Sequence, residues 1–208
     1  MRTIWGRANS SNVKKVLWAA DEANMSFVHV NAGGQYGIVN EPEYRALNPN
    51  GLVPCFKDGE MVLWESNAIV RYIAAKYAEG TLWQADPAKR ADGDRWMDWT
   101  TSTFAPAGAF RDVFWNIVRT PAPERDMEAV AKGIERCNNL LQIVNDVLEK
   151  QPYLSGDQFG MGDIPLGSFI YAWFEMPILR RELPHLASWY SRLQDRPAYR
   201  KRITIGLT

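Results

Sequence analysis

The stretch VPCFKDGEMVLWES, residues 53–66, predicts a β-hairpin that leads directly into a helix. Two short apolar runs flank the turn residues Lys57-Asp58-Gly59, and the dense turn signal of residues 48–51 precedes the first run. After Glu65 the spacing becomes helical, with one side formed by Ile69, Tyr72, Ile73 and Lys76. We therefore expect two antiparallel strands and a helix in this order.

The segment before the hairpin alternates strands and helices. Residues 3–5 and 27–30 are short β-prone runs, and residues 42–47 predict a short helix. A longer helix is expected from Ser10, with one apolar stripe formed by Val13, Val16, Leu17 and Ala20. The order is β-α-β-α-β-β-α, and its opening βαβ unit should be parallel and right-handed.

The chain changes character near Glu79-Gly80-Thr81. From Pro87 onward only helical patterns are found, and Pro106 and Gly108 disturb the first of them. The helices are expected at residues 87–104, 124–149, 163–173 and 186–193. The predicted fold class is α/β plus all-α, divided into an α/β domain at 1–78, a linker at 79–86 and an all-helical domain at 87–208.

Composition argues against several classes of function. The 208 residues carry 24 Lys plus Arg and 24 Asp plus Glu, so the formal net charge is zero. Binding of nucleic acid or of a membrane surface through bulk basic charge is therefore not expected, and no apolar run approaches the roughly 18 residues of a membrane span. Two cysteines and two histidines predict neither a disulfide framework nor a metal site. We expect a cytoplasmic protein without a metal or a bound cofactor.

Polar groups lie at two junctions between a strand and a helix. Ser10 is at the first; because the chain has only two histidines, we expect its hydroxyl to donate to an anion at the helix N-terminus and not to act as a nucleophile. Glu65-Ser66 is at the second, either as an ordinary helix cap or as a site for an ammonium and a carboxylate. Pro54 opens its strand either as a trans edge-strand proline or as a cis-proline that exposes the Val53 backbone to an extended peptide.

Five segments, taken together, resemble the glutathione S-transferase family. They are residues 9–17 (NSSNVKKVL), 47–54 (LNPNGLVP), 63–73 (LWESNAIVRYI), 161–167 (MGDIPLG) and 185–199, from HLASWY to RPAY. They follow in order over nearly the whole chain and are most similar to a bacterial, serine- or asparagine-type branch near the theta and phi classes. The resemblance implies a thioredoxin-like first domain and an all-helical second domain.

The resemblance also implies a site for glutathione. A cis peptide between Val53 and Pro54 would let the Val53 backbone pair with the cysteinyl part, while Glu65 and Ser66 hold the γ-glutamyl end. Ser10 matches the catalytic serine of the family, and the neighbouring asparagines are alternative donors to the thiolate. The predicted catalytic residues are accordingly Ser10 and Asn12, and the predicted glutathione-binding residues are Asn9, Leu52, Val53, Pro54, Glu65 and Ser66.

The chain departs from the family pattern in two places. Related classes hold the glycyl carboxylate of glutathione with a basic residue after the second strand and with Gln or Lys before Val-Pro, where this chain has uncharged residues 38–40 and Leu52. Arg7, Lys14 and Arg71 are then the candidates for that carboxylate. The capping-box acid of the buried helix is matched by Asp163, but Gly160 stands where the family has Ser or Thr, so a weakened cap is expected.

The family implies that the glutathione thiol is activated as a thiolate and transferred to an apolar electrophile, with glutathione as co-substrate. A glutathione-dependent disulfide reductase and a non-catalytic binder of apolar ligands are the alternatives. Cys55 is not expected to be catalytic, because it follows Pro54 on a strand, away from the start of the first helix. The predicted wall of the electrophile site consists of Trp99, Phe110, Phe114 and Trp115.

A two-fold homodimer is also implied by the resemblance. Trp96 and Trp99 lie on one face of the helix that starts at Pro87, among charges of alternating sign. Such a face suits a self-complementary contact between two copies. Packing of both tryptophans in the core of their own chain is the alternative interpretation.

Overall fold

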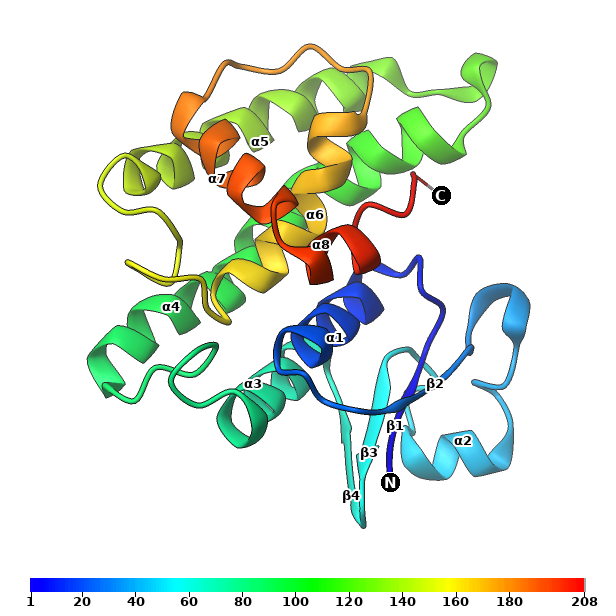
Figure 1. Cartoon of the computed structure of the whole chain (residues 1–208). Coiled ribbons are helices and arrows are strands. Elements are labelled where there is room, and N and C mark those ends of the chain that lie inside the picture. Colours follow the sequence, from blue (N-terminus) through cyan, green and yellow to red (C-terminus); the bar gives the residue numbers. More distant parts are fainter. Residues whose placement is uncertain (208) are drawn as a thin grey trace.

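A four-stranded sheet organises the first domain in the computed structural model, which describes residues 1–207 (Figure 1). Its strands are β1 (Arg2–Trp5), β2 (Val28–Val30), β3 (Cys55–Asp58) and β4 (Met61–Trp64), in the order β2-β1-β3-β4. β1 pairs parallel with β2 and antiparallel with β3, and the hairpin β3–β4 is antiparallel. The predicted parallel βαβ unit and antiparallel hairpin are both confirmed.

Helices cover both faces of this sheet. α1 (Ser11–Glu22) and α3 (Ser66–Tyr77) pack against each other and share one apolar core with β1 and β3. The fully buried members of this layer include Ile4, Leu17, Phe56, Ile69 and Ile73. A smaller cluster around Tyr44 of α2 (Pro42–Leu47) contains Cys55 and Ala32, and the one-turn helix η1 (Gly34–Tyr36) precedes α2.

Helices joined by loops form the second domain, and none of its described residues lies in a named strand. Its helices are α4 (Pro87–Trp99), η2 (Thr100–Arg119), η3 (Ala122–Glu124), α5 (Met127–Leu148), α6 (Asp163–Glu175), α7 (Pro184–Gln194) and α8 (Pro197–Arg202). The helical path of η2 breaks at Gly108, whose φ of 110° and ψ of −1° are not helical. The predicted disturbance near Pro106 and Gly108 is confirmed, and the break lies at the glycine because a positive φ costs it little. Between residues 1 and 207, no helix is both long enough and apolar enough to cross a bilayer.

The two domains meet along α1, which lies between the sheet and the helices α6 and α8 (Figure 1). Trp18 of α1 is fully buried there, and its Nε1 donates to Glu22 at 2.8 Å. The Glu22 carboxylate also pairs with Arg196 at 2.6 Å, and Asp21 pairs with Arg202 at 2.7 Å. These contacts tie the C-terminal half of α1 to α8 and its N-cap residue, and they hold the helix at the junction of the domains.

The start of α6 is capped by the fully buried Asp163. Its carboxylate accepts hydrogen bonds from the backbone N–H groups of Leu154 (2.8 Å), Ser155 (3.3 Å) and Gly160 (3.1 Å) and from the indole of Trp189 (2.8 Å). Burial raises the pKa of this carboxyl, and the hydrogen bonds oppose that shift. The hydroxyl that Gly160 lacks comes from Ser155, whose Oγ accepts from the Gly162 N–H at 3.1 Å. The cap is therefore completed by a residue outside the expected motif.

Trp96 and Trp99, which were predicted to form a dimer contact, are packed inside their own chain. Trp96 is 5% exposed and contacts Trp99 edge to face at 5.3 Å, and Trp99 packs against the same core. The acidic neighbours Asp94 and Asp98 both pair with Arg71 of α3, at 2.7 and 2.6 Å. These side chains join α4 to the rest of its own chain, so the independent sequence argument for a homodimer is wrong.

Candidate functional site

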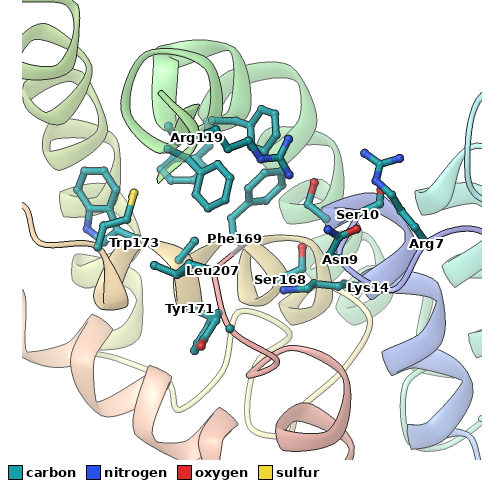
Figure 2. A pocket seen from close by; sticks show the side chains of 18 residues that line it. Arg7, Asn9, Ser10, Lys14, Arg119, Ser168, Phe169, Tyr171, Trp173 and Leu207 are labelled. Atoms are coloured by element: carbon teal, nitrogen blue, oxygen red, sulfur yellow. The ribbon is translucent and has the colours of Figure 1, made fainter. Parts of the chain in front are cut away.

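A pocket lies at the junction of the domains, between the start of α1 and the helices η2 and α6 (Figure 2). Its floor and far wall are largely aromatic, and the chain just beyond α8 closes one side with Gly206 and Leu207. The apolar and aromatic lining comprises Phe104, Ala109, Phe110, Phe114, Phe169, Tyr171, Ala172, Trp173 and Met176, besides Leu207. The wall formed by the start of α1 is polar and contains Asn9, Ser10 and Ser11. An apolar molecule in this pocket would thus lie against a polar helix N-terminus.

Ser10 is the N-cap residue of α1, with an extended backbone (φ −74°, ψ 125°). Its carbonyl accepts the first helical hydrogen bond from the Lys14 N–H at 2.8 Å, but its hydroxyl makes no cap hydrogen bond. The hydroxyl of an N-cap serine usually accepts a hydrogen bond from a backbone N–H in the first turn of the helix. Here the hydroxyl lines the pocket at the positive end of a helix dipole, where it can donate to an anion.

The Asn12 side chain is directed toward α3 and not into the pocket. Its Oδ1 accepts hydrogen bonds from Lys15 Nζ at 3.0 Å and from the Ser66 hydroxyl at 3.3 Å, and the residue is exposed. It is not among the described residues that line the pocket. The structure therefore separates the two predicted catalytic residues, with Ser10 at the pocket and Asn12 beside α3.

Glu65 and Ser66 form the junction between β4 and α3. Of the two residues, Glu65 is the N-cap of α3, and it has a positive φ (φ 72°, ψ 109°). A positive φ is uncommon for a residue with a side chain, and strained residues of this kind cluster at functional sites. Ser66 is the buried first residue of α3, so its backbone N–H is one of the unpaired donors at the helix start.

A buried lysine lies next to this junction. Lys15 is 2% exposed, and its Nζ lies 3.0 Å from Asn12 Oδ1 and 3.5 Å from Ser66 Oγ. Burial lowers the pKa of Lys15 to about 8, and the nearby Glu65 carboxylate opposes this shift. Glu65, Ser66, Asn12 and Lys15 thus form one polar cluster with both signs of charge, which suits a zwitterionic group.

The loop before β3 contains a cis peptide between Val53 and Pro54, as the resemblance implied. Leu52 is 67% exposed, and its carbonyl accepts from the Tyr44 hydroxyl at 2.7 Å and from Asn48 Nδ2 at 2.8 Å. A Cβ on Gly6 would lie only 3.3 Å from Val53 Cβ, so the loop after β1 and this loop pack closely together. The Val53 loop therefore lies directly beside the turn that follows β1, although none of residues 52–54 is among the described lining residues of the pocket.

Both cysteines are buried and unpaired. Burial raises the pKa of Cys55 to about 11 and that of Cys137 to about 12, so neither thiol ionises near neutral pH. This agrees with the prediction that Cys55 is not catalytic. Over residues 1–207, no three His, Cys, Asp or Glu side chains gather as metal ligands do.

Comparison with known proteins gives the same picture. Residues 2–75 match the family model described as glutathione S-transferase, N-terminal domain, and residues 106–197 match the C-terminal domain. The chain is 43% identical over 210 residues to glutathione S-transferase GstB of Escherichia coli K12, with all of both chains covered. The chain belongs to the glutathione S-transferase family.

Two further relatives lie at different distances within this glutathione S-transferase family. The theta class glutathione S-transferase of Xanthomonas axonopodis pv. citri, solved with glutathione bound, is 59% identical, with a TM-score of 0.94 over 100% of this chain and 99% of that one. Glutathione S-transferase 3 of Zea mays is 33% identical over 96% of this chain and 92% of the relative. The thioredoxin-like first domain and the helical second domain are those of the family.

Of the four residues predicted to form the wall of the electrophile site, two line the pocket and two are not among its described lining residues. Phe110 and Phe114 line the pocket and stack on each other at 5.3 Å. Trp99 and Trp115 are not among the described lining residues. Trp99 stacks instead on Phe104, at 5.9 Å, and Trp115 is 48% exposed, with its ring edge to face with Phe110 at 6.2 Å.

Several lining residues were missed from sequence. Phe169, Tyr171 and Trp173 come from α6, whose buried residues lie on all sides of the helix. A helix that is apolar all round gives no periodic signal to tell which face borders a pocket. The structure also distinguishes the three candidates for the glycyl carboxylate of glutathione. Arg71 forms ion pairs with Asp94 and Asp98, whereas Arg7 and Lys14 line the pocket.

Proposed function

We propose that this chain is a glutathione transferase that activates the glutathione thiol and transfers it to an apolar electrophile. The observation that carries the proposal is the Ser10 hydroxyl, which is free of cap hydrogen bonds at the start of α1 and faces an aromatic pocket. The cis Val53–Pro54 loop and the Glu65–Ser66 junction supply neighbouring sites for the cysteinyl and γ-glutamyl parts.

The proposed chemistry depends on thiol acidity. A free thiol has a pKa near 8.5, so only about 3% is thiolate at pH 7, and a drop of about two units raises this to roughly 75%. Two units correspond to about 2.7 kcal/mol, which one charge-assisted hydrogen bond and a helix dipole can supply. The thiol proton goes to solvent, the sulfur lone pair forms the C–S bond, and the leaving group departs with its bonding electrons. Ser10 remains protonated as a donor.

The positions and burial of the two cysteines favour conjugation over disulfide reduction as the activity of this chain. A glutaredoxin-like exchange needs an accessible thiol at the start of the first helix, and this chain has Ser10 there, while Cys55 and Cys137 are buried. The purified chain should conjugate glutathione with chlorodinitrobenzene and show little reduction of hydroxyethyl disulfide. Activity with the disulfide alone would support the reductase, and glutathione binding without either activity would support a non-catalytic binder.

Glu65→Ala is expected to raise the glutathione KM at least tenfold. The Glu65 carboxylate would pair with the ammonium of the γ-glutamyl end, and a lost charged hydrogen bond is worth about 1.5–3 kcal/mol. Steady-state kinetics at varied glutathione concentration measure this. Glu65→Gln keeps a hydrogen-bond acceptor without the charge and serves as the matched variant. Its glutathione KM should lie between that of the wild type and that of Glu65→Ala. An unchanged KM in Glu65→Ala would contradict the assignment.

We also propose that two copies associate as a homodimer, on family membership and on the position of one exposed tryptophan. Trp64 is 40% exposed on β4, which lies at the edge of the sheet. A partner would cover this apolar side chain. Light scattering should give about twice the 23.7 kDa chain mass, and the mass of a single chain would contradict the proposal.

A further inference from the structure

α1 buries a lysine beside the junction of β4 and α3. Lys15 is 2% exposed. Its Nζ lies 3.0 Å from Asn12 Oδ1, 3.5 Å from Ser66 Oγ and 5.5 Å from the centre of the Phe169 ring. All three of these groups are neutral, and a buried charge among neutral groups is costly. Burial lowers the pKa of Lys15 only to about 8, so the ammonium stays mostly charged at neutral pH. An anion that binds nearby would stabilise such a cation.

The Lys15 ammonium determines how the Ser66 hydroxyl can be used. Lys15 Nζ donates to Ser66 Oγ, and the hydroxyl in turn donates to Asn12 Oδ1 at 3.3 Å. An ammonium has donors and no acceptor, so the Ser66 oxygen must accept from it, and the Ser66 proton must point elsewhere. A hydroxyl that accepts from a cation is also a stronger donor, because hydrogen bonds in a chain polarise one another. Lys15 thus prepares the Ser66 hydroxyl to donate to an anion.

The backbone at this junction favours an anion as well. Ser66 is the first residue of α3, so its N–H is one of the unpaired donors at the positive end of the helix dipole. The preceding residue, Glu65, is exposed, whereas Ser66 and Lys15 are buried. An α-amino-acid head carries an ammonium and a carboxylate on one carbon, so it needs an anionic and a cationic group side by side. Glu65 supplies the first, and Lys15 with the start of α3 supplies the second.

We propose that Lys15 is a positioning residue for the α-carboxylate at the γ-glutamyl end of glutathione and acts on it through the Ser66 hydroxyl. The ammonium is too deeply buried to be a ligand itself. It orients and polarises the hydroxyl and adds positive charge next to the start of α3. Glu65 then recognises the ammonium of glutathione, and Ser66 with Lys15 recognises the carboxylate. This inference rests on the proposed transferase function and deepens it by one residue that does not touch glutathione.

Two analogues of glutathione separate the two charges of the γ-glutamyl end. γ-Aminobutyryl-cysteinylglycine keeps the ammonium and lacks the α-carboxylate, whereas glutaryl-cysteinylglycine keeps the carboxylate and lacks the ammonium. Both analogues keep the thiol and the glycyl carboxylate. The measurement is kcat/KM for each thiol with saturating chlorodinitrobenzene, and every variant is compared with the wild type for the same thiol.

Lys15→Met should lower kcat/KM by about tenfold or more with glutathione and with the glutaryl analogue, because a charge-assisted contribution to binding the carboxylate is lost. With the γ-aminobutyryl analogue, which has no α-carboxylate, the loss should be less than about twofold. The loss with glutathione should lie in KM, with kcat within about threefold, because Ser10 still donates to the sulfur. Lys15→Arg keeps the charge and should recover most of the loss.

Two further variants serve as controls. Glu65→Ala should show the opposite pattern, with a large loss for the γ-aminobutyryl analogue and a small one for the glutaryl analogue. Lys132→Met makes the same substitution on the exposed surface of α5, where Lys132 pairs with Glu128, and should leave kcat/KM unchanged for all three thiols. Urea unfolding shows whether each variant is folded. If Lys15→Met is not, Lys15→Gln takes its place, since it keeps a donor to Ser66 without the charge, and its loss should again depend on the carboxylate.

Three outcomes would contradict the inference. Equal losses with all three thiols, or no loss with any, would show that Lys15 has a structural role alone, and the proposed transferase function would stand. A loss confined to the two thiols that carry the ammonium would show that Lys15 acts through Glu65 and not through Ser66. If the wild-type chain conjugates none of the three thiols, the proposed function itself fails together with the inference.

Discussion

Ser10→Ala is expected to lower kcat/KM for chlorodinitrobenzene by about 10–100-fold and to raise the pKa of the bound glutathione thiol by at least one unit. The hydroxyl makes no cap hydrogen bond, so its removal leaves α1 intact and takes away only the donor to the thiolate. A hydrogen bond to a charged group contributes about 1.5–3 kcal/mol, and each 1.4 kcal/mol is a tenfold change in rate.

The measurement is the pH dependence of kcat/KM, because a merely structural role would not move the thiol pKa. Ser10→Thr keeps a hydroxyl at the same position and should recover a large part of the activity. Asn12→Ala is the decisive comparison, since Asn12 binds Lys15 and Ser66 and does not line the pocket. Loss of activity in Asn12→Ala, with Ser10→Ala unaffected, would show that the thiolate donor has been misassigned.

Asp163→Ala is expected to lower the free energy of unfolding by about 4 kcal/mol or more. The carboxylate is fully buried and accepts four hydrogen bonds, from three backbone N–H groups and the Trp189 indole. A buried donor that loses its partner costs about 1–3 kcal/mol, and partial relaxation prevents the four costs from adding in full. Changes of this size from one residue are exceptional.

Urea unfolding followed by tryptophan fluorescence measures this difference. Asp163→Asn should be nearly as unstable, because its amide nitrogen would face N–H donors where the carboxylate has an acceptor. Asp157 lies exposed in the same loop, and Asp157→Ala should change the free energy of unfolding by no more than about 0.5 kcal/mol. Equal effects of Asp163→Ala and Asp157→Ala would show that the cap does not stabilise the domain.

The cap at α6 shows how far a local motif can be predicted. The acid at Asp163 and the missing hydroxyl at Gly160 are both visible in the sequence, and they indicated a weakened capping box. Ser155 supplies the hydroxyl from a loop seven residues before Gly162. A capping motif is defined by fixed spacing, so a donor or acceptor that arrives from outside that spacing cannot be recognised from the pattern.

The tryptophans of α4 show a second limit. Helical spacing correctly placed Trp96 and Trp99 close together, but it could not tell a face turned toward the protein core from a face turned toward a partner. Periodicity measures which residues share a side of a helix, and burial of that side depends on which other elements are packed there.

The sequence by itself determined the order of strands and helices in the first domain, the division into an α/β and a helical domain, and the position of Ser10 and Glu65-Ser66 at helix starts; it did not predict α8 or the helical residues between 104 and 119. The features that it determined depend on local propensity, periodicity and spacing along the chain. Only the tertiary structure decided that Asn12 turns toward α3, that Arg71 is neutralised by Asp94 and Asp98, and that Arg7 and Lys14 share one aromatic pocket. Each of these depends on contacts between residues far apart in sequence, and the direction of a side chain is set by such partners and not by its own neighbours along the chain.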